Sequence, residues 1–177
     1  MKTAALLLVL VTGLGVVSAP DDRVLVQSLV RDGRVEVSFE LQNGFTEDLR
    51  AAIRSGLPAA ITYEIELRRH VFIWFDRKLA GATVTASVQF DNLTRHHQLL
   101  RTVDGRGEEP QVTADEDQVR RWLTSGEHLP LFGTDLLEAN VEYSVRVRAW
   151  TRPRVSWGFW PWARGAATGY ARFTFVR

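Results

Sequence analysis

The chain contains four histidines and no cysteine, which limits the metal and redox chemistry that it can perform. His96 and His97 are adjacent, and neighbouring side chains of a strand point to opposite faces, so these two cannot bind one metal ion. His70 and His128 are isolated, and no two histidines have the spacing that places both on one face of a helix. We therefore predict surface or interface histidines, no metal site and no cofactor.

Acidic residues that could act as a general acid or base occur in two places. Residues 115–117, Asp-Glu-Asp, have the pattern of a capped helix start. Glu64 and Glu66 lie on one face of a predicted strand with Arg68, which indicates a solvated ladder of charges. The chain has no Gly-x-Ser-x-Gly motif for an activated serine. We predict no catalytic residue and therefore no enzyme.

A polar turn contains Asn92, Thr94 and Arg95. One interpretation is turn chemistry, in which Asp91 and Asn92 bond to the local backbone while Thr94 and Arg95 tie the turn to the sheet. The alternative is recognition, in which Arg95 binds a carboxylate or a phosphate. The sequence leaves both interpretations open.

Residues 155–164, Val-Ser-Trp-Gly-Phe-Trp-Pro-Trp-Ala-Arg, are unusually aromatic. Their glycine and proline disfavour a strand or helix interior, so we expect an exposed loop between the last two strands. Tryptophan favours the level of the lipid headgroups, and arginine suits anionic phosphates. We predict contact with a membrane or a protein partner through six residues: Arg154, Trp157, Phe159, Trp160, Trp162 and Arg164. The alternative is that the aromatic rings fold back and close one end of the core.

The first residues have the pattern of a secretory signal. Lys2 precedes the apolar residues 4–17, and Ser18 and Ala19 are small residues suited to cleavage. We expect export and removal of residues 1–19. A retained membrane anchor is the alternative, because the uncharged stretch is close to the length of about 20 residues that spans a bilayer and Pro20 disfavours cleavage.

The overall composition indicates one domain without special chemistry. There are 22 Lys and Arg against 21 Asp and Glu, and no basic patch dominates, so we predict no nucleic-acid partner. Without cysteine there is no disulfide, and stability must come from ordinary burial. Residues 20–177 are enough for a single domain with a sizeable core.

Strands are predicted where apolar and polar residues alternate. The expected strands are 24–30, 35–41, 61–67, 84–90, 97–101, 141–148 and 169–176, and Asp32-Gly33 forms a hairpin turn between the first two. We expect a bend near His70, a polar loop at 104–110 and an irregular stretch at 129–137.

Two short helices are also predicted. The first covers Thr46 to Ser55, with Thr46 as its N-cap and Gly56 at its C-terminal end. The second follows a capping box at residues 113–116 and ends at Gly126. Because helices do not alternate with the roughly seven strands, the expected fold is mainly β, an antiparallel β-sandwich with two short helical insertions. The alternative is one strongly curved sheet whose helices cover its concave face.

Three segments together resemble a known family. They are residues 51–58 (Ala-Ala-Ile-Arg-Ser-Gly-Leu-Pro), residues 64–69 (Glu-Ile-Glu-Leu-Arg-Arg) running into Trp74-Phe75-Asp76, and residues 90–96 (Phe-Asp-Asn-Leu-Thr-Arg-His). Their order and spacing are similar to those of an uncharacterised family of exported bacterial proteins, domain of unknown function 4390. The resemblance implies export and an envelope location, and it implies no activity.

These observations lead to one expected role and one alternative. We expect an exported periplasmic or envelope protein, a non-enzymatic β-sandwich module that associates with a membrane or binds an envelope protein. The alternative is a carrier that holds a small apolar ligand in a cavity between sheet and helices, which requires an apolar pocket of several hundred Å³.

Overall fold

The computed structural model describes residues 23–70, 76–151 and 167–176. These residues form ten strands, two α-helices and one 3₁₀-helix. In chain order they are β1 (Val24–Arg31), β2 (Arg34–Leu41), α1 (Glu47–Arg54), β3 (Ala59–Arg69), β4 (Arg77–Asp91), β5 (His96–Val103), β6 (Arg106–Gly107), β7 (Gln111–Thr113), α2 (Glu116–Thr124), β8 (Ser125–Gly133), η1 (Thr134–Leu136), β9 (Val141–Thr151) and β10 (Ala167–Phe175).

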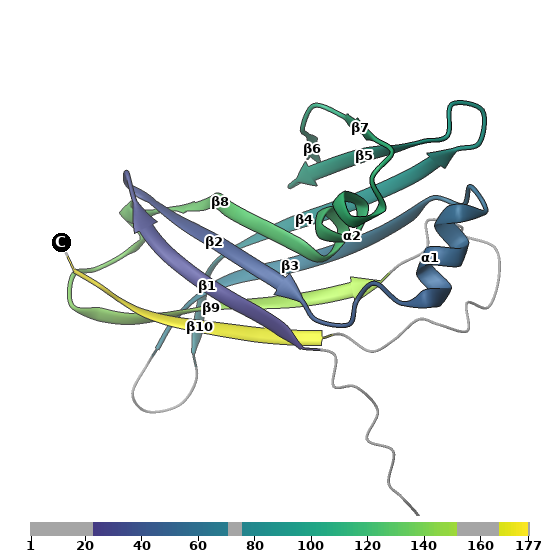
Figure 1. The fold of residues 1–177 in the computed structure, drawn as a ribbon. Coiled ribbons are helices and arrows are strands. Elements are labelled where there is room, and N and C mark those ends of the chain that lie inside the picture. The colour runs from purple at the N-terminus through teal and green to yellow at the C-terminus, as the bar shows by residue number, and fades with distance from the viewer. Residues whose placement is uncertain (1–22, 71–75, 152–166, 177) are drawn as a thin grey trace, which may run out of the picture.

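The strands form two antiparallel sheets that pack face to face. The small sheet has the order β1-β2-β8, and the large sheet has the order β10-β9-β3-β4-β5-β6, with β7 pairing with β5 as well. Figure 1 shows the small sheet in front of the large one, with α1 and α2 beside it on the same side of the large sheet. The predicted antiparallel sandwich with two helical insertions is therefore confirmed. The helices continue the layer of the small sheet, so the single curved sheet of the alternative is wrong.

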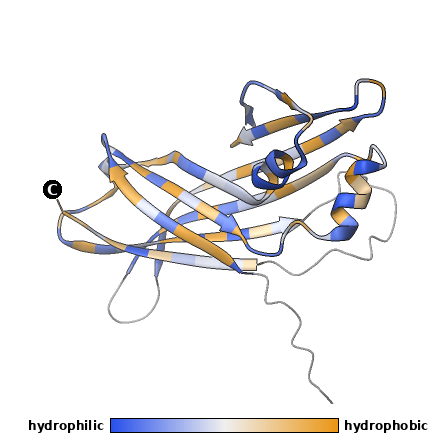
Figure 2. Cartoon of the chain, viewed as in Figure 1, coloured by the Kyte–Doolittle hydropathy of each residue, from blue (hydrophilic) through white to orange (hydrophobic). Residues whose placement is uncertain are grey.

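The core lies between the two layers and follows from the alternation of the strands. Hydrophobic and hydrophilic residues alternate along most strands, as Figure 2 shows. Ile61, Tyr63 and Ile65 of β3 point inward and are buried. The ring of Phe39 from β2 lies 4.3 Å, centroid to centroid, from that of Tyr63 and joins the two sheets.

The two sheets meet most closely where β1 crosses β10. A Cβ atom on Gly169 of β10 would lie 1.9 Å from the carbonyl oxygen of Val24 in β1, which no real side chain tolerates. Glycine is therefore required at this position, because only a residue without Cβ lets the two backbones approach this closely. The crossing brings the first described strand of the chain onto the last.

Helix α2 rests on the large sheet through a buried polar contact. The Tyr63 hydroxyl donates a hydrogen bond of 2.7 Å to the carbonyl of Leu123 in α2. Arg101 of β5 donates to the carbonyls of Trp122 (3.3 Å) and Ser125 (3.0 Å), and its guanidinium lies 4.3 Å from the centre of the Trp122 ring. Burial raises the pKa of Tyr63 and lowers the pKa of Arg101. The last carbonyls of a helix have no donor within the helix itself. Arg101 thus supplies hydrogen bonds to carbonyls at the C-terminal end of α2.

Helix α1 begins and ends as the sequence predicts. The Thr46 hydroxyl accepts a hydrogen bond of 3.2 Å from the Leu49 amide, and Gly56 adopts φ +84° directly after the helix. Helix α2 differs from its prediction at both ends. Its N-cap is Asp115, whose carboxylate accepts from the Asp117 amide at 2.9 Å. The helix stops at Thr124, and Gly126 belongs to β8.

Several short or irregular strands were predicted as loops. The polar loop at 104–110 contains β6, because Asp104 (φ 49°) and Gly105 (φ 80°) make the same kind of hairpin turn as Asp32 and Gly33. The stretch 129–137, expected to be irregular, contains most of β8 and the helix η1. Its hydrophobic pattern is hidden because the register of β8 against β2 shifts twice. A register shift between Leu67 and Arg68 lies close to the bend predicted at His70.

Candidate functional site

The turn between β4 and β5 is stabilised by hydrogen bonds to its own backbone amides. It contains the polar residues Asn92, Thr94 and Arg95. The Asp91 carboxylate accepts hydrogen bonds from the amides of Leu93 (2.8 Å) and Thr94 (3.3 Å). These bonds hold the pKa of Asp91 below its usual value. The Arg95 amide donates to the Asp91 carbonyl at 2.8 Å, and Arg95 itself adopts φ 61°. The predicted turn chemistry is therefore present at Asp91.

The other residues of this turn have different surroundings. Asn92 packs against the end of α1, since a Cβ on Gly56 would lie 2.8 Å from its side-chain nitrogen. The Thr94 carbonyl lies 2.6 Å from the Nδ1 atom of His96. The Arg95 guanidinium is exposed, lies 6.0 Å from the centre of the Phe90 ring and forms no ion pair with a described residue. Its cation is accessible to solvent, so the structure leaves the recognition interpretation untested.

An apolar side chain is exposed at the tip of the same turn. Leu93 is 95% exposed, and Leu57, on the connection from α1 to β3, is 41% exposed. The contact between Asn92 and Gly56 holds these two connections next to each other. We call this end of the sandwich the helix end (Figure 1). It carries the start of β3, the β4–β5 turn and both connections of α1.

The predicted aromatic contact residues, Trp157, Phe159, Trp160, Trp162, Arg154 and Arg164, lie outside the described residues. Neither membrane contact nor the fold-back alternative is therefore tested. The nearest described residues on the two sides of this segment are Thr151 and Ala167. Thr151 pairs with Ile61 at the start of β3, and Ala167 pairs with Ala149 of β9, so both lie at the helix end. Val24, which follows the predicted signal segment, lies beside Gly169 at this end as well.

The two helices are joined by ion pairs that the sequence did not predict. Glu116 at the start of α2 forms an ion pair with Arg50 of α1, whose Nε lies 2.6 Å from the carboxylate, and accepts a hydrogen bond of 2.8 Å from Arg54. The hydrogen bond from Arg54 is the main cause that lowers the pKa of Glu116. The carboxylate is neutralised by α1, an arrangement that holds the helices together and does not favour a general base.

The histidines lie apart from one another. His97, predicted to be a surface or interface residue, is only 8% exposed and packs against the Phe90 ring at 4.8 Å, so the prediction is wrong for this residue. It lies on the inward face of β5, which the short apolar pattern there did not reveal. His70 contacts Asp76 at 2.9 Å, and His128 contacts Glu36 at 3.2 Å. Within the described parts of the chain, no three potential metal ligands gather.

The outer face of the large sheet contains a network of charges centred on Glu66. Its carboxylate contacts Arg68 at 2.9 Å and Lys78 at 3.3 Å, and Arg146 of β9 as well. Gly81 leaves the room for Lys78, since a Cβ there would lie 3.0 Å from the lysine ammonium. The Glu66 side chain is only 14% exposed, so the solvated ladder predicted for Glu64, Glu66 and Arg68 is wrong at its centre.

Two opposing effects act on the ionisation of Glu66. Burial acts to raise its pKa, but the hydrogen bonds from Arg68, Arg146 and Lys78 outweigh burial and lower the pKa to about 2. A carboxyl group with this pKa is ionised at any physiological pH and cannot donate a proton. Glu66 therefore has the properties of a structural anion.

Three clefts lined by described residues are small, and charged side chains are among the residues that line each of them. They have volumes of about 180, 260 and 330 Å³. The largest lies between the β2–α1 connection and α2, and Glu40, Arg120 and Arg121 are among the residues that line it. None of these three clefts is the predominantly apolar pocket of several hundred Å³ that the apolar-ligand carrier requires.

Comparison with known proteins identifies a family and no function. Residues 25–153 match the domain of unknown function DUF4390. No curated protein and no solved structure matches the chain. None of the helices in the described residues is long and apolar enough to cross a membrane. The match covers more than half of the sequence, including the β4–β5 turn and the Glu66 network, and the chain therefore belongs to the DUF4390 family.

Proposed function

We propose that this member of the DUF4390 family is an exported, non-enzymatic module that associates with a membrane surface in the cell envelope through the helix end of its sandwich. The observation that carries the proposal is Leu93, which is 95% exposed at the tip of a rigidly bonded turn. The N-terminal signal pattern supports export, and the pairing of Glu66 and Glu116 with cations supports a role without acid–base catalysis.

Exposed leucines are common on protein surfaces, so one alone does not make a docking site. At the helix end, however, Leu93 and Leu57 lie on neighbouring connections, and Arg95 offers an accessible cation beside them. The aromatic segment continues from Thr151 and returns at Ala167, both at this end. Apolar side chains next to cations suit the boundary between acyl chains and anionic headgroups.

The first experiment measures sedimentation of the protein with vesicles of phosphatidylcholine containing phosphatidylglycerol. Replacing one exposed leucine removes roughly 1 kcal/mol of transfer free energy, so Leu93→Ser should weaken partitioning roughly fivefold. The matched control is Val176→Ser, because Val176 is 73% exposed but follows β10 at the opposite end. Equal binding of the two variants would contradict the proposal.

The second experiment tests the aromatic segment. Replacing Trp157, Trp160 and Trp162 together by serine should abolish vesicle binding while the far-ultraviolet circular dichroism and the unfolding midpoint stay close to those of the parent. Unchanged vesicle binding together with loss of folding would instead support the fold-back alternative. Vesicles of phosphatidylcholine alone test the contribution of the arginines, because their attraction requires anionic lipid.

A further inference from the structure

A β-bulge interrupts the small sheet between β2 and β8. Val37 pairs with Leu129 and Phe39 pairs with Gly126, so Glu127 and His128 of β8 face the single residue Ser38. His128 adopts φ 48°, and its amide donates to the Ser38 hydroxyl at 3.0 Å. The histidine ring lies 3.2 Å from the Glu36 carboxylate. These contacts fix the bulge, which makes it a defined feature of the sheet.

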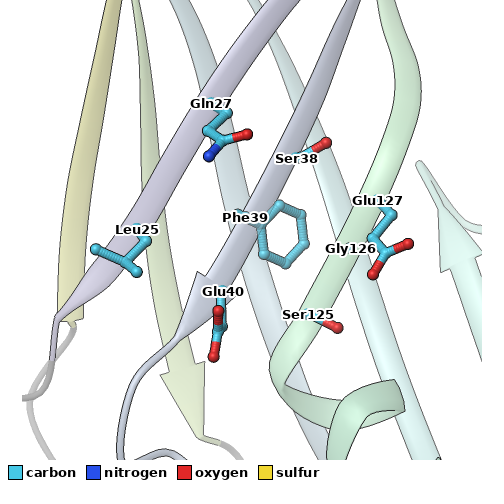
Figure 3. A pocket seen from close by; sticks show the side chains of 8 residues that line it. All are labelled: Leu25, Gln27, Ser38, Phe39, Glu40, Ser125, Gly126 and Glu127. Atoms are coloured by element: carbon cyan, nitrogen blue, oxygen red, sulfur yellow. The ribbon is translucent and has the colours of Figure 1, made fainter.

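The bulge opens a cleft of about 180 Å³ on the outer face of the small sheet, away from the core. Figure 3 shows the Phe39 ring between β2 and β8, with Glu40 and Glu127 on either side of it and Leu25 on β1. Gln27, Ser38 and Ser125 complete the polar part of the lining. Gly126 is required here, because a Cβ at this position would lie 2.7 Å from the Phe39 ring. The cleft has room for one side chain and not for a folded element.

Neither carboxylate of the cleft is in direct contact with a cation of the described residues, although the charge of Glu127 also acts on Arg101 of β5. Glu40 and Glu127 are both exposed, and neither takes part in an ion pair among the described residues, whereas the neighbouring Glu36 contacts His128. Two like charges beside one small recess repel each other, and a cation between them would remove that repulsion. The apolar surface of the cleft continues onto β1, where Leu25 is 44% exposed.

We infer that this cleft, which we call the β2–β8 cleft, binds an arginine side chain of a protein partner. The aliphatic stem of the arginine lies against the exposed Leu25, and the guanidinium lies between Glu40 and Glu127. An amphipathic side chain of this kind buries its stem on apolar surface while its charge stays with the carboxylates. Arginine fits better than lysine, because its planar fork donates in two directions and can reach both carboxylates.

The cleft and the membrane-binding helix end are separate surfaces that rest on different residues. The cleft lies on the outer face of the small sheet, whereas Leu57 and Leu93 lie on connections of the large sheet and α1. Loss of arginine binding therefore leaves vesicle binding unchanged, and the two proposals fail independently. A partner that uses the cleft reaches the protein while its helix end faces a bilayer.

The experiment is an NMR titration of the ¹⁵N-labelled full chain with N-acetyl-arginine methylamide. The measured quantities are the chemical-shift changes of the Ser38, Gly126 and Glu127 amides. We expect saturable shifts confined to the cleft, with a Kd on the order of 1–10 mM, as befits a single side chain. N-acetyl-citrulline methylamide has nearly the same shape without the charge and should produce no saturation. The lysine analogue should bind several times more weakly than arginine.

The decisive variant combines Glu40→Gln with Glu127→Gln, and we expect it to bind arginine at least tenfold more weakly. The matched control is Glu64→Gln with Glu109→Gln, two exposed glutamates away from the cleft. Equal affinity in the two double variants, equal shifts with citrulline, or shifts spread over the surface would each overturn the proposal.

Discussion

The outer faces of the two sheets use the same residue type in opposite ways. On the large sheet, the Glu66 carboxylate contacts Arg68, Lys78 and Arg146 within the chain. On the small sheet, Glu40 and Glu127 flank a cleft and form no ion pair with a described residue. The difference arises from register. The unbroken ladder between β3 and β9 sets Glu66 directly opposite Arg146, whereas the bulge in β8 displaces Glu127 from a cross-strand partner.

The comparison teaches which charges hold the fold and which are available to a partner. A carboxylate that is mostly buried among cations cannot be neutralised without leaving those cations unpaired. An exposed carboxylate without an ion-pair partner contributes little to the free energy of folding. It is therefore available to bind another molecule. Substitutions on the two faces should therefore have very different effects on stability.

The largest effect is expected for Glu66→Gln. Three cations would remain around a neutral side chain, and two of them, Arg68 and Arg146, are themselves mostly buried. We expect a loss of about 2–3 kcal/mol in the free energy of unfolding, measured by urea denaturation. Glu64→Gln on the same face is the control, because Glu64 is exposed. If both variants lose the same amount, Glu66 is not the centre of a stabilising network.

The acid dependence of stability should have the same origin. The folded pKa of Glu66 is about 2, below its usual value of 4.5, so its contribution to stability is present above pH 4.5 and disappears as the pH falls towards 2. Unfolding midpoints measured between pH 6 and pH 2 should therefore fall more steeply in the parent than in Glu66→Gln. Parallel curves for the two proteins would show that other groups cause the acid sensitivity.

An intermediate effect is expected where the bulge meets the core. Gly126→Ala pushes a methyl group against the Phe39 ring, which is packed on Tyr63 and cannot move freely. We expect a loss of about 1–2 kcal/mol and weaker arginine binding at the β2–β8 cleft. Gly107→Ala is the control, because a Cβ there meets only the Leu100 side chain at an ordinary 3.8 Å. A stable Gly126→Ala variant with normal arginine binding would show that the sheet adapts without changing the cleft.

The smallest effect is expected for Glu40→Gln combined with Glu127→Gln. Because neither carboxylate forms an ion pair with a described residue, stability should change by less than about 0.5 kcal/mol in either direction. The same urea measurement decides the point. A loss as large as that of Glu66→Gln would mean that both faces of the molecule use their carboxylates for folding.

The regular parts of the fold follow from the sequence, and the irregular parts do not. Alternation locates β2, β3 and β9, and the Asp32-Gly33 turn locates the first hairpin, because both signals act within a few residues. β8 was missed because its bulge breaks the alternation and Pro130 lies within it. β6 and β7 have two and three residues, which is too short for any periodic signal.

The sites show the same division. The turn chemistry of Asp91 is local and was predicted from its neighbours in sequence. The Glu66 network joins β3, β4 and β9, and the β2–β8 cleft joins β1, β2 and β8, so both depend on pairing between distant segments. No local pattern distinguishes Glu66 from the exposed Glu64 two residues earlier.

The crossing of β1 over β10 has a consequence for how the chain acquires its structure. Val24 and Gly169 come from opposite ends of the sequence, and their contact exists only when both strands are present. Contacts of such long sequence separation form slowly, since a long loop must close before they stabilise the chain. β10 follows the other nine described strands in the sequence, so the core is incomplete until β10 has been synthesised.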